Sequence, residues 1–325
     1  MKLLACVFAL AGLLLAQPPR LAAFLWHESP NDLATLAGIE KGLVAAGLRP
    51  EVARFAAHGD AEAARRELAR LAAGGFDLVF ALGTQSALLT RDAILDRPVI
   101  YSAVTDPVAS GVVKGWDGSG SHLAGVSNAI PPETVLHVFQ RAVPQLARLG
   151  ILRSRTAGVV SAAELARMRA HLTTKGAPAL TVVEALTDDA QGIAQAVQEL
   201  VAQQVQAIWI PIDIVIYQNL AQVRAALGKA RVPLLSSSLQ GARSGAVAGV
   251  LVDYELLGEC TAALALEVLA GKRKPGVIPT VTLRSYQVVV NLAAARELGY
   301  ELPLSLLALA DVLLDEAPGG RDGKR

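Results

Sequence analysis

Small polar side chains follow two apolar runs of the sequence, and their positions could place them around a ligand. The run of residues 99–104 ends at Thr105 and Asp106, and the apolar run before it ends at Thr84 and Gln85. Short, nearly continuous apolar runs are typical of strands that are covered on both faces. In an open α/β sheet, ligands bind at the carboxyl ends of the strands. We therefore expect these hydroxyl, amide and carboxylate groups to face one binding site.

Similar polar residues recur at strand ends in the second half of the chain, so the candidate ligand-binding set is drawn from both halves. Its members are Ser29, Gly83, Thr84, Gln85, Thr105, Asp106, Ser127, Asn128, Asp213, Ser237 and Ser238. For any one of them, capping of the next helix is a common alternative role. A set with few titratable groups suits binding more than catalysis. Asp106 and Asp213 could act as an acid/base pair only at close range, and a simpler role is to hold a cationic group.

Sequence motifs of the common enzyme classes are absent. The chain has no G-x-S-x-G turn, no Walker A sequence and no G-x-G-x-x-G fingerprint. Its five histidines are scattered, and no pair has the spacing of metal ligands on one helix face. We therefore expect no enzyme activity, no cofactor and no metal.

Composition indicates a globular protein that is close to neutral. The chain has 325 residues, of which 53% are hydrophobic and 18% are charged, and its formal net charge is +1. This length suits two domains of ordinary size, and the apolar content excludes global disorder. A net charge near zero gives no electrostatic basis for binding nucleic acid or an anionic membrane surface.

Residues 1–16 have the pattern of a signal peptide, with one basic residue, an apolar run and a small residue at Ala16. This predicts export to the periplasm or another extracytoplasmic location, and the run is too short to span a membrane. Cys6 completes a lipoprotein-type box, but the box precedes the apolar run, so we expect no lipid on Cys6. A buried N-terminal helix of a cytosolic protein is the alternative. Without the leader, Cys260 is a lone cysteine, which is typical of a small core residue.

The expected elements alternate between strand and helix, and the series occurs twice. Strands are expected at residues 20–26, 50–57, 76–82, 99–104, 148–152, 180–186, 205–212 and 231–235. Helical periodicity fills most intervals, with Asn31 or Asp32 expected to cap the first helix and Asp188 or Asp189 a later one. The alternation favours parallel sheets with helices on both faces. We predict an α/β protein of two Rossmann-like, doubly wound lobes joined by a hinge.

The end of the chain is expected to complete both lobes. We assign residues 17–127 to lobe 1, completed by about 253–278, and residues 128–252 to lobe 2, completed by about 279–316. Within this last part, the pattern predicts a strand over 277–291 and a helical piece over 303–315. Residues 317–325 are expected to form a disordered tail.

Four parts of the sequence resemble the substrate-binding proteins of bacterial ABC transporters, in the group with tryptophan- and tyrosine-binding members. They are a Gly-Thr turn at 82–87, a hallmark stretch at 98–113, a hinge strand at 123–127 and a C-terminal pattern at 289–299 and 303–311. The resemblance implies a periplasmic-binding-protein-like fold of type I, with two lobes and a cleft that closes on a small solute. It implies delivery of that solute to a membrane permease, without catalysis.

The chain departs from this family pattern in its second half. The family commonly has Pro-Thr-Asp-Asn-Thr where residues 211–215 are Pro-Ile-Asp-Ile-Val, and Ser-Asp-Thr where residues 236–238 are Ser-Ser-Ser. Asp213 is kept and one carboxylate is lost, which would be costly if that carboxylate paired with a buried ammonium group. We therefore expect either an aromatic amino acid or a more apolar small solute as the ligand.

Two other functions remain open from the sequence. The same lobes could present a solute to a membrane receptor as a sensor, or, less favoured, could form a racemase- or lyase-type enzyme around Asp106 and Asp213. In either case we expect a monomer with no nucleic-acid partner.

Overall fold

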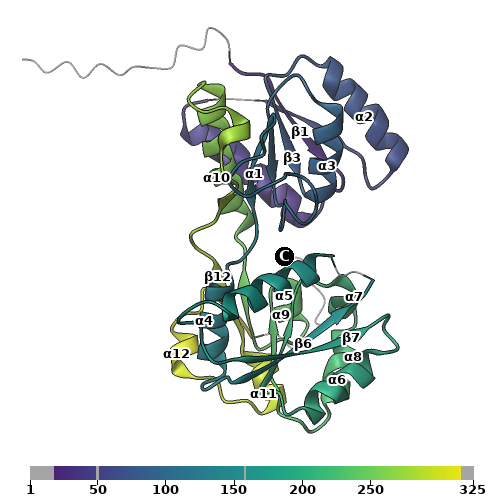
Figure 1. Cartoon of the computed structure of the whole chain (residues 1–325), viewed down its shortest axis with the longest axis vertical. Helices are drawn as coiled ribbons and strands as arrows, with labels where there is room; N and C mark the ends of the chain where they lie inside the picture. The colour runs from purple at the N-terminus through teal and green to yellow at the C-terminus, as the bar shows by residue number, and fades with distance from the viewer. Residues whose placement is uncertain (1–17, 49–50, 157–158, 316–325) are drawn as a thin grey trace, which may run out of the picture. The chain divides into compact units, whose positions relative to one another are not determined.

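The computed structural model describes residues 18–48, 51–156 and 159–315, and these form two compact units (Figure 1). Unit 1 contains the described residues up to Ala103, together with Gly111–Val126 and Tyr254–Thr280. Unit 2 contains Val104–Ser110, Ser127–Asp253 and the described residues from Val281 onward. The expected signal peptide, Cys6 and the expected tail at 317–325 lie outside the described residues.

The first sheet has the strand order β11-β5-β4-β3-β1-β2. The strands are β1 (Leu21–Leu25), β2 (Val52–Ala56), β3 (Leu78–Leu82), β4 (Val99–Ser102), β5 (Leu123–Ser127) and β11 (Val281–Thr282). The β1–β2, β1–β3, β3–β4 and β4–β5 pairs are parallel. Every residue of β1, β3, β4 and β5 is buried, as expected for parallel strands covered on both faces.

Helices lie on both faces of this sheet. They are α1 (Pro30–Ala45), α2 (Ala61–Ala73), α3 (Thr84–Ala93) and α10 (Tyr254–Leu269), and a short 3-10 turn follows at Pro275–Val277. Figure 1 shows α1 and α10 side by side on one face, and α2 and α3 on the other. A Cβ atom added at Gly38 would lie 2.0 Å from the Glu255 carbonyl oxygen, and one at Gly258 would lie 2.1 Å from that of Thr35. These glycines therefore allow the backbones of α1 and α10 to touch.

The second sheet has the strand order β13-β12-β10-β9-β8-β6-β7. The strands are β6 (Arg148–Ser154), β7 (Thr181–Thr187), β8 (Ala207–Ile210), β9 (Leu234–Ser236), β10 (Ala248–Leu251), β12 (Gln287–Asn291) and β13 (Val312–Leu314). Strand β12 runs antiparallel to β10, while the other recorded pairs of this sheet are parallel.

The helices of unit 2 pack on both faces of the second sheet, against three clusters of buried apolar residues. They are α4 (Pro132–Ala142), α5 (Val159–Leu172), α6 (Ile193–Ala202), α7 (Ile214–Gln218), α8 (Leu220–Leu227), α9 (Leu239–Arg243), α11 (Leu292–Leu298) and α12 (Leu304–Leu307). Trp209 of β8 packs in the core that includes α4 and α5. Its neighbours Ile208 and Ile210 pack in the core that includes α6, α7 and α8. The alternation of side chains along a strand explains this division.

The predicted α/β fold with two parallel-sheet lobes is confirmed, but several local predictions were wrong. Residues 277–291 are not one strand, because the 3-10 turn, β11 and β12 occupy this stretch separately and Pro279 cannot donate to a sheet. Residues 303–315 are not one helix. Asp311 exchanges backbone and side-chain hydrogen bonds with Val288 of β12, and β13 follows it. Sheet pairing overrides the local helical pattern there.

Short elements and caps account for the remaining differences. The sequence did not predict α7, α9 or β10, which have four or five residues each. The cap of α1 is Ser29 rather than Asn31 or Asp32, because the Ser29 hydroxyl accepts the Asp32 N–H. Asp189 accepts the N–H groups of Gln191 and Gly192 just before α6, whose first residue is Ile193.

Candidate functional site

Gly83, Thr84 and Gln85 form the turn between β3 and α3 in unit 1. Gly83 has a φ of 84°, a left-handed conformation that a side chain would strain, and its N–H donates to the Ser102 carbonyl at 2.9 Å. No side chain caps the N-terminus of α3. Thr84 is partly exposed and Gln85 is exposed. These two polar side chains are therefore accessible at the carboxyl edge of the first sheet.

Ser29 follows β1 at the same edge, but it has a structural role. Its hydroxyl accepts the Asp32 N–H at 3.2 Å and donates to Asp32 Oδ2 at 2.6 Å. Burial is the largest influence on Asp32 and raises the pKa of its carboxyl. Ser29 is thus the N-cap of α1, which is the alternative role that the sequence left open.

Thr105 and Asp106 lie on the segment after β4, which belongs to unit 2. Asp106 Oδ1 accepts the Val108 and Ala109 N–H groups at 3.2 and 2.9 Å. Its Oδ2 accepts a hydrogen bond from Arg167 Nη1 of α5 at 2.6 Å. The Asp106 carboxylate therefore holds its own turn and also binds a cation within the protein.

Ser127 ties the end of β5 to the segment that contains Thr105. The Ser127 hydroxyl is fully buried, donates to the Thr105 carbonyl at 3.0 Å and accepts the Ala129 N–H at 3.0 Å. Asn128 beside it is 6% exposed. This part of the predicted set is internal to unit 2.

Asp213 caps α7 and is 1% exposed. Its Oδ2 accepts the Ser154 N–H at 2.6 Å and the Ser154 hydroxyl at 2.9 Å. Its Oδ1 accepts the N–H groups of Val215 and Ile216 at 3.1 and 3.2 Å. Both carboxylate oxygens therefore have donors from the protein itself, from the ends of two neighbouring strands.

Ser237 and Ser238 follow β9, the strand next to β8. The Ser237 hydroxyl accepts the indole N–H of the buried Trp209 at 3.0 Å. The Ser238 hydroxyl accepts the Gly241 N–H at 2.9 Å and caps α9. Asp213, Ser237 and Ser238 thus meet at one edge of the second sheet, as the sequence predicted, since β8 and β9 are parallel neighbours.

Apolar side chains are exposed at the same edge of unit 2. Ile214 follows Asp213 and is 50% exposed, and Leu239 follows Ser238 and is 36% exposed. Single exposed apolar side chains are common on protein surfaces, and here two of them each follow a buried polar residue of the candidate set or its neighbour in sequence. The edge can therefore offer both apolar contact and hydrogen bonding.

Two charged residues of α5, Glu164 and Arg167, belong to this edge and were missed from the sequence. Glu164 is 7% exposed, and its Oε2 accepts the Ile212 N–H at 2.8 Å. Burial raises the pKa of its carboxyl to about 7. A usable signal was the spacing of Glu164 from Ser161 and Met168, which places a carboxyl on the buried face of a helix.

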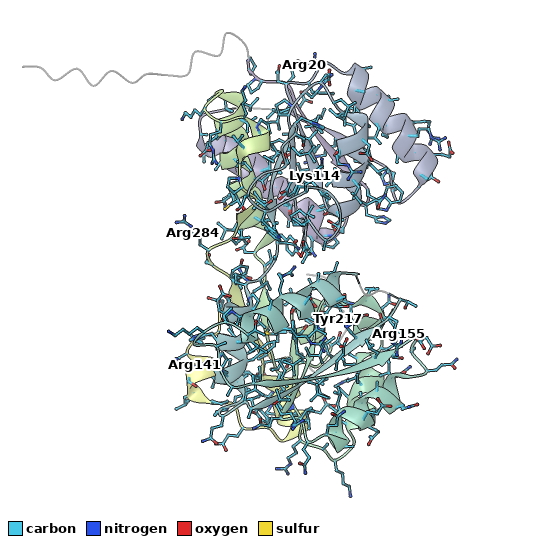
Figure 2. The ribbon with its side chains drawn as sticks, viewed as in Figure 1. Arg20, Lys114, Arg141, Arg155, Tyr217 and Arg284 are labelled. Carbon is cyan, nitrogen blue, oxygen red and sulfur yellow. The ribbon has the colours of Figure 1, made fainter. Side chains whose placement is uncertain are left out.

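Contacts of these α5 residues connect two of the predicted site residues. Arg167 binds Asp106, and Glu164 binds the backbone of Ile212, next to Asp213. Tyr217 of α7, labelled in Figure 2, is electrostatically coupled to Glu164 and Asp213, and burial raises the pKa of its hydroxyl. The structure thus places Asp106 and Asp213 in one polar cluster of unit 2.

Neither a metal site nor a membrane-spanning helix occurs in the part of the chain that the structure describes. There, no group of three or more His, Cys, Asp and Glu side chains is arranged to hold a metal ion. Within the same residues, no helix combines the length and the apolar character that crossing a bilayer requires.

A family model of ABC transporter substrate-binding proteins matches residues 21–313. The chain belongs to this family. Members of this family are substrate-binding proteins of ABC transporters and act outside the cytoplasm.

Individual relatives agree with this assignment. A tyrosine-binding protein of Clostridioides difficile is 29% identical over 215 residues, a match that covers 66% of this chain and 61% of the relative. A domain of Streptococcus pneumoniae solved in complex with L-Trp is 26% identical, with a TM-score of 0.71, and the match covers 92% of this chain and all of that chain. A ligand-free, open substrate-binding protein with adhesive properties from Clostridium difficile is 23% identical with a TM-score of 0.80, over 92% of this chain and 99% of that chain, which supports the fold.

Proposed function

We propose that this protein binds an aromatic amino acid, or a closely related small solute with an apolar body, outside the cytoplasm. The observation that carries the proposal is the similarity over nearly the whole chain to a domain solved with L-Trp. The edge of unit 2 supports it, because it carries the exposed Ile214 and Leu239. The charged cluster of Asp106, Glu164 and Arg167 reaches this edge where Glu164 accepts the Ile212 N–H, two residues before Ile214. A ligand with a ring and a charged headgroup matches both surfaces.

The proposed partner is the membrane permease of an ABC importer, to which a monomeric protein delivers the solute without changing it. The geometry of Asp213 supports the absence of catalysis. A general base needs an oxygen available to the substrate, whereas both oxygens of Asp213 accept hydrogen bonds from within the protein. Of the predicted contacts, we retain Thr84 and Gln85 in unit 1 as groups that bind the ligand directly.

Thermal melting of the purified protein against the twenty amino acids tests this function. A true ligand raises the melting temperature in proportion to the logarithm of its concentration above Kd. We expect shifts with L-tryptophan or L-tyrosine, and a smaller shift when Thr84→Val removes a hydroxyl. Thr282→Val is the matched control, because Thr282 is exposed on β11. Equal melting curves with all twenty amino acids would reject the amino-acid proposal.

A further inference from the structure

Helix α5 places a carboxyl and a guanidinium group next to each other at the polar edge of unit 2. Glu164 and Arg167 are three positions apart, a spacing that puts side chains on the same face of a helix about 5–6 Å apart at their Cβ atoms. Glu164 is 7% exposed, and the side chain of Arg167 is 22% exposed. The pair is therefore mostly buried, and part of the Arg167 side chain remains exposed.

Each of the two groups has hydrogen-bonding capacity that the protein does not use. Glu164 Oε2 accepts the Ile212 N–H, but Oε1 accepts no hydrogen bond from a described residue. Arg167 Nη1 donates to Asp106, while Nη2 is buried and has no acceptor among the described residues. An unpaired buried donor is costly, and native proteins keep few of them. Glu164 thus keeps a free acceptor and Arg167 a free donor, three positions apart on the same helix.

The charges around Glu164 come from three elements. Arg167 on the same helix favours the ionised carboxylate, and Asp106, on the segment after β4, is paired with Arg167. Tyr217 lies on α7, and Asp213 lies just before this helix. The Tyr217 hydroxyl interacts electrostatically with the carboxyl groups of both Asp213 and Glu164. Burial outweighs the attraction of Arg167, so that the pKa of Glu164 rises to about 7.

We propose that a zwitterionic amino acid completes this cluster, with its carboxylate accepting from Arg167 Nη2 and its ammonium group donating to Glu164 Oε1, and that its binding releases a proton from Glu164. The inference rests on the proposed function and adds the residues that bind the ammonium and carboxylate groups of the ligand. It also explains how the chain can bind an ammonium group without the carboxylate that is missing from residues 236–238.

The proton balance gives the direction of the pH effect. Before binding, Glu164 is partly protonated at neutral pH. The ligand ammonium group favours the carboxylate, and the displaced proton leaves to the solvent. Affinity therefore rises with pH. For a group with a pKa of about 7 that is ionised in the complex, the ionised fraction in the free protein changes about tenfold from pH 6 to pH 8. The affinity should change by the same factor.

Isothermal titration calorimetry of the wild-type protein with L-tryptophan and L-tyrosine tests this linkage. Titrations at pH 6 in two buffers of different ionisation enthalpy count the protons released, and titrations at pH 8 give the change in Kd. We expect close to one proton released at pH 6 and about tenfold tighter binding at pH 8. These measurements need no variant, so they do not depend on how a substitution folds.

Variants and ligand analogues separate the two contacts. Glu164→Gln should lower the affinity for L-tryptophan and remove the pH dependence of that affinity. It should leave unchanged the affinity for indole-3-propionate, which lacks the ammonium group. Arg167→Gln should weaken L-tryptophan binding but leave L-tryptophanamide, which lacks the carboxylate, unaffected. Arg169→Gln is the matched control, because Arg169 lies on the same helix and pairs with Glu184 at 3.0 Å.

The outcomes distinguish this inference from the function on which it rests. Amino-acid binding with no proton release, and with the same affinity in Glu164→Gln, would overturn the inference and leave the proposed function in place. A wild-type protein that binds none of the twenty amino acids would overturn both.

Discussion

Asp213 accepts two hydrogen bonds from Ser154, one from the backbone N–H at 2.6 Å and one from the hydroxyl group at 2.9 Å. Because Ser154 ends β6 and Asp213 follows β8, this contact joins two neighbouring strands at the edge where ligands of α/β proteins bind. From the sequence, Asp213 is expected to be a ligand contact. The structure gives it a role in holding that edge together.

Replacing Asp213 should therefore lower stability before it changes ligand recognition. Asp213→Ala leaves the Ser154, Val215 and Ile216 N–H groups without their acceptor, and each buried unpaired group costs about 1–3 kcal/mol. We expect the free energy of unfolding in urea to fall by several kcal/mol, and by less in Asp213→Asn, which keeps one oxygen. A ligand-free Asp213→Ala protein as stable as the wild type would contradict this assignment.

Glu164 should make stability depend on pH. Its pKa rises from 4.5 in the unfolded chain to about 7 in the folded protein, so between these values the folded state binds more protons. The free energy of unfolding should then fall as pH rises from about 5 to 8, by up to about 3 kcal/mol from this group. Glu164→Gln should lack this contribution, and its stability relative to the wild type should increase over that range. If the free energy of unfolding had the same pH dependence in the two proteins, the raised pKa of Glu164 would be refuted.

The contact between α1 and α10 should be sensitive to single methyl groups. Gly38→Ala would bring a Cβ atom within 2.0 Å of the Glu255 carbonyl oxygen, so the helices must separate. Overpacking of this kind costs about 1–3 kcal/mol, which chemical denaturation would detect. Gly115→Ala is a suitable control, since the nearest atom to its added Cβ is 3.9 Å away. Equal stability of the two variants would argue against the close approach.

The hydrogen bond between Trp209 and Ser237 can be measured with a double-mutant cycle. Ser237→Ala leaves the indole N–H of a 2%-exposed tryptophan without its acceptor, at a cost of about 1–3 kcal/mol. In a Trp209→Phe background, Ser237→Ala should lower the free energy of unfolding much less, because no indole N–H remains without an acceptor. Additive effects of the two substitutions on the free energy of unfolding would indicate that the bond does not form.

The sequence predicted the architecture well where the pattern was local and repeated. Apolar runs such as residues 76–82 and 99–104 correspond to β3 and β4, although β4 ends at Ser102 and Ala103 takes a left-handed φ of 58°. Where long-range pairing decides the structure, the pattern failed. Residues 303–315 have a helical pattern, but residues 312–314 pair with β12 as a strand of the second sheet.

Prediction of the site was limited by what a single residue pattern can show. Strand ends located Asp213, Ser237 and Ser238 at one edge, but the pattern could not tell a helix cap from a ligand contact, because both roles use the same residue types. Strand ends do not reveal Glu164 and Arg167, because these residues reach the edge from a helix.

The central claim is that this protein binds an amino acid, and a direct calorimetric titration of the purified wild-type protein with L-tryptophan and L-tyrosine at pH 8 tests it. We expect a saturable heat with one ligand per chain for at least one of the two. The absence of saturable heat with both, and with each of the other eighteen amino acids, would contradict it.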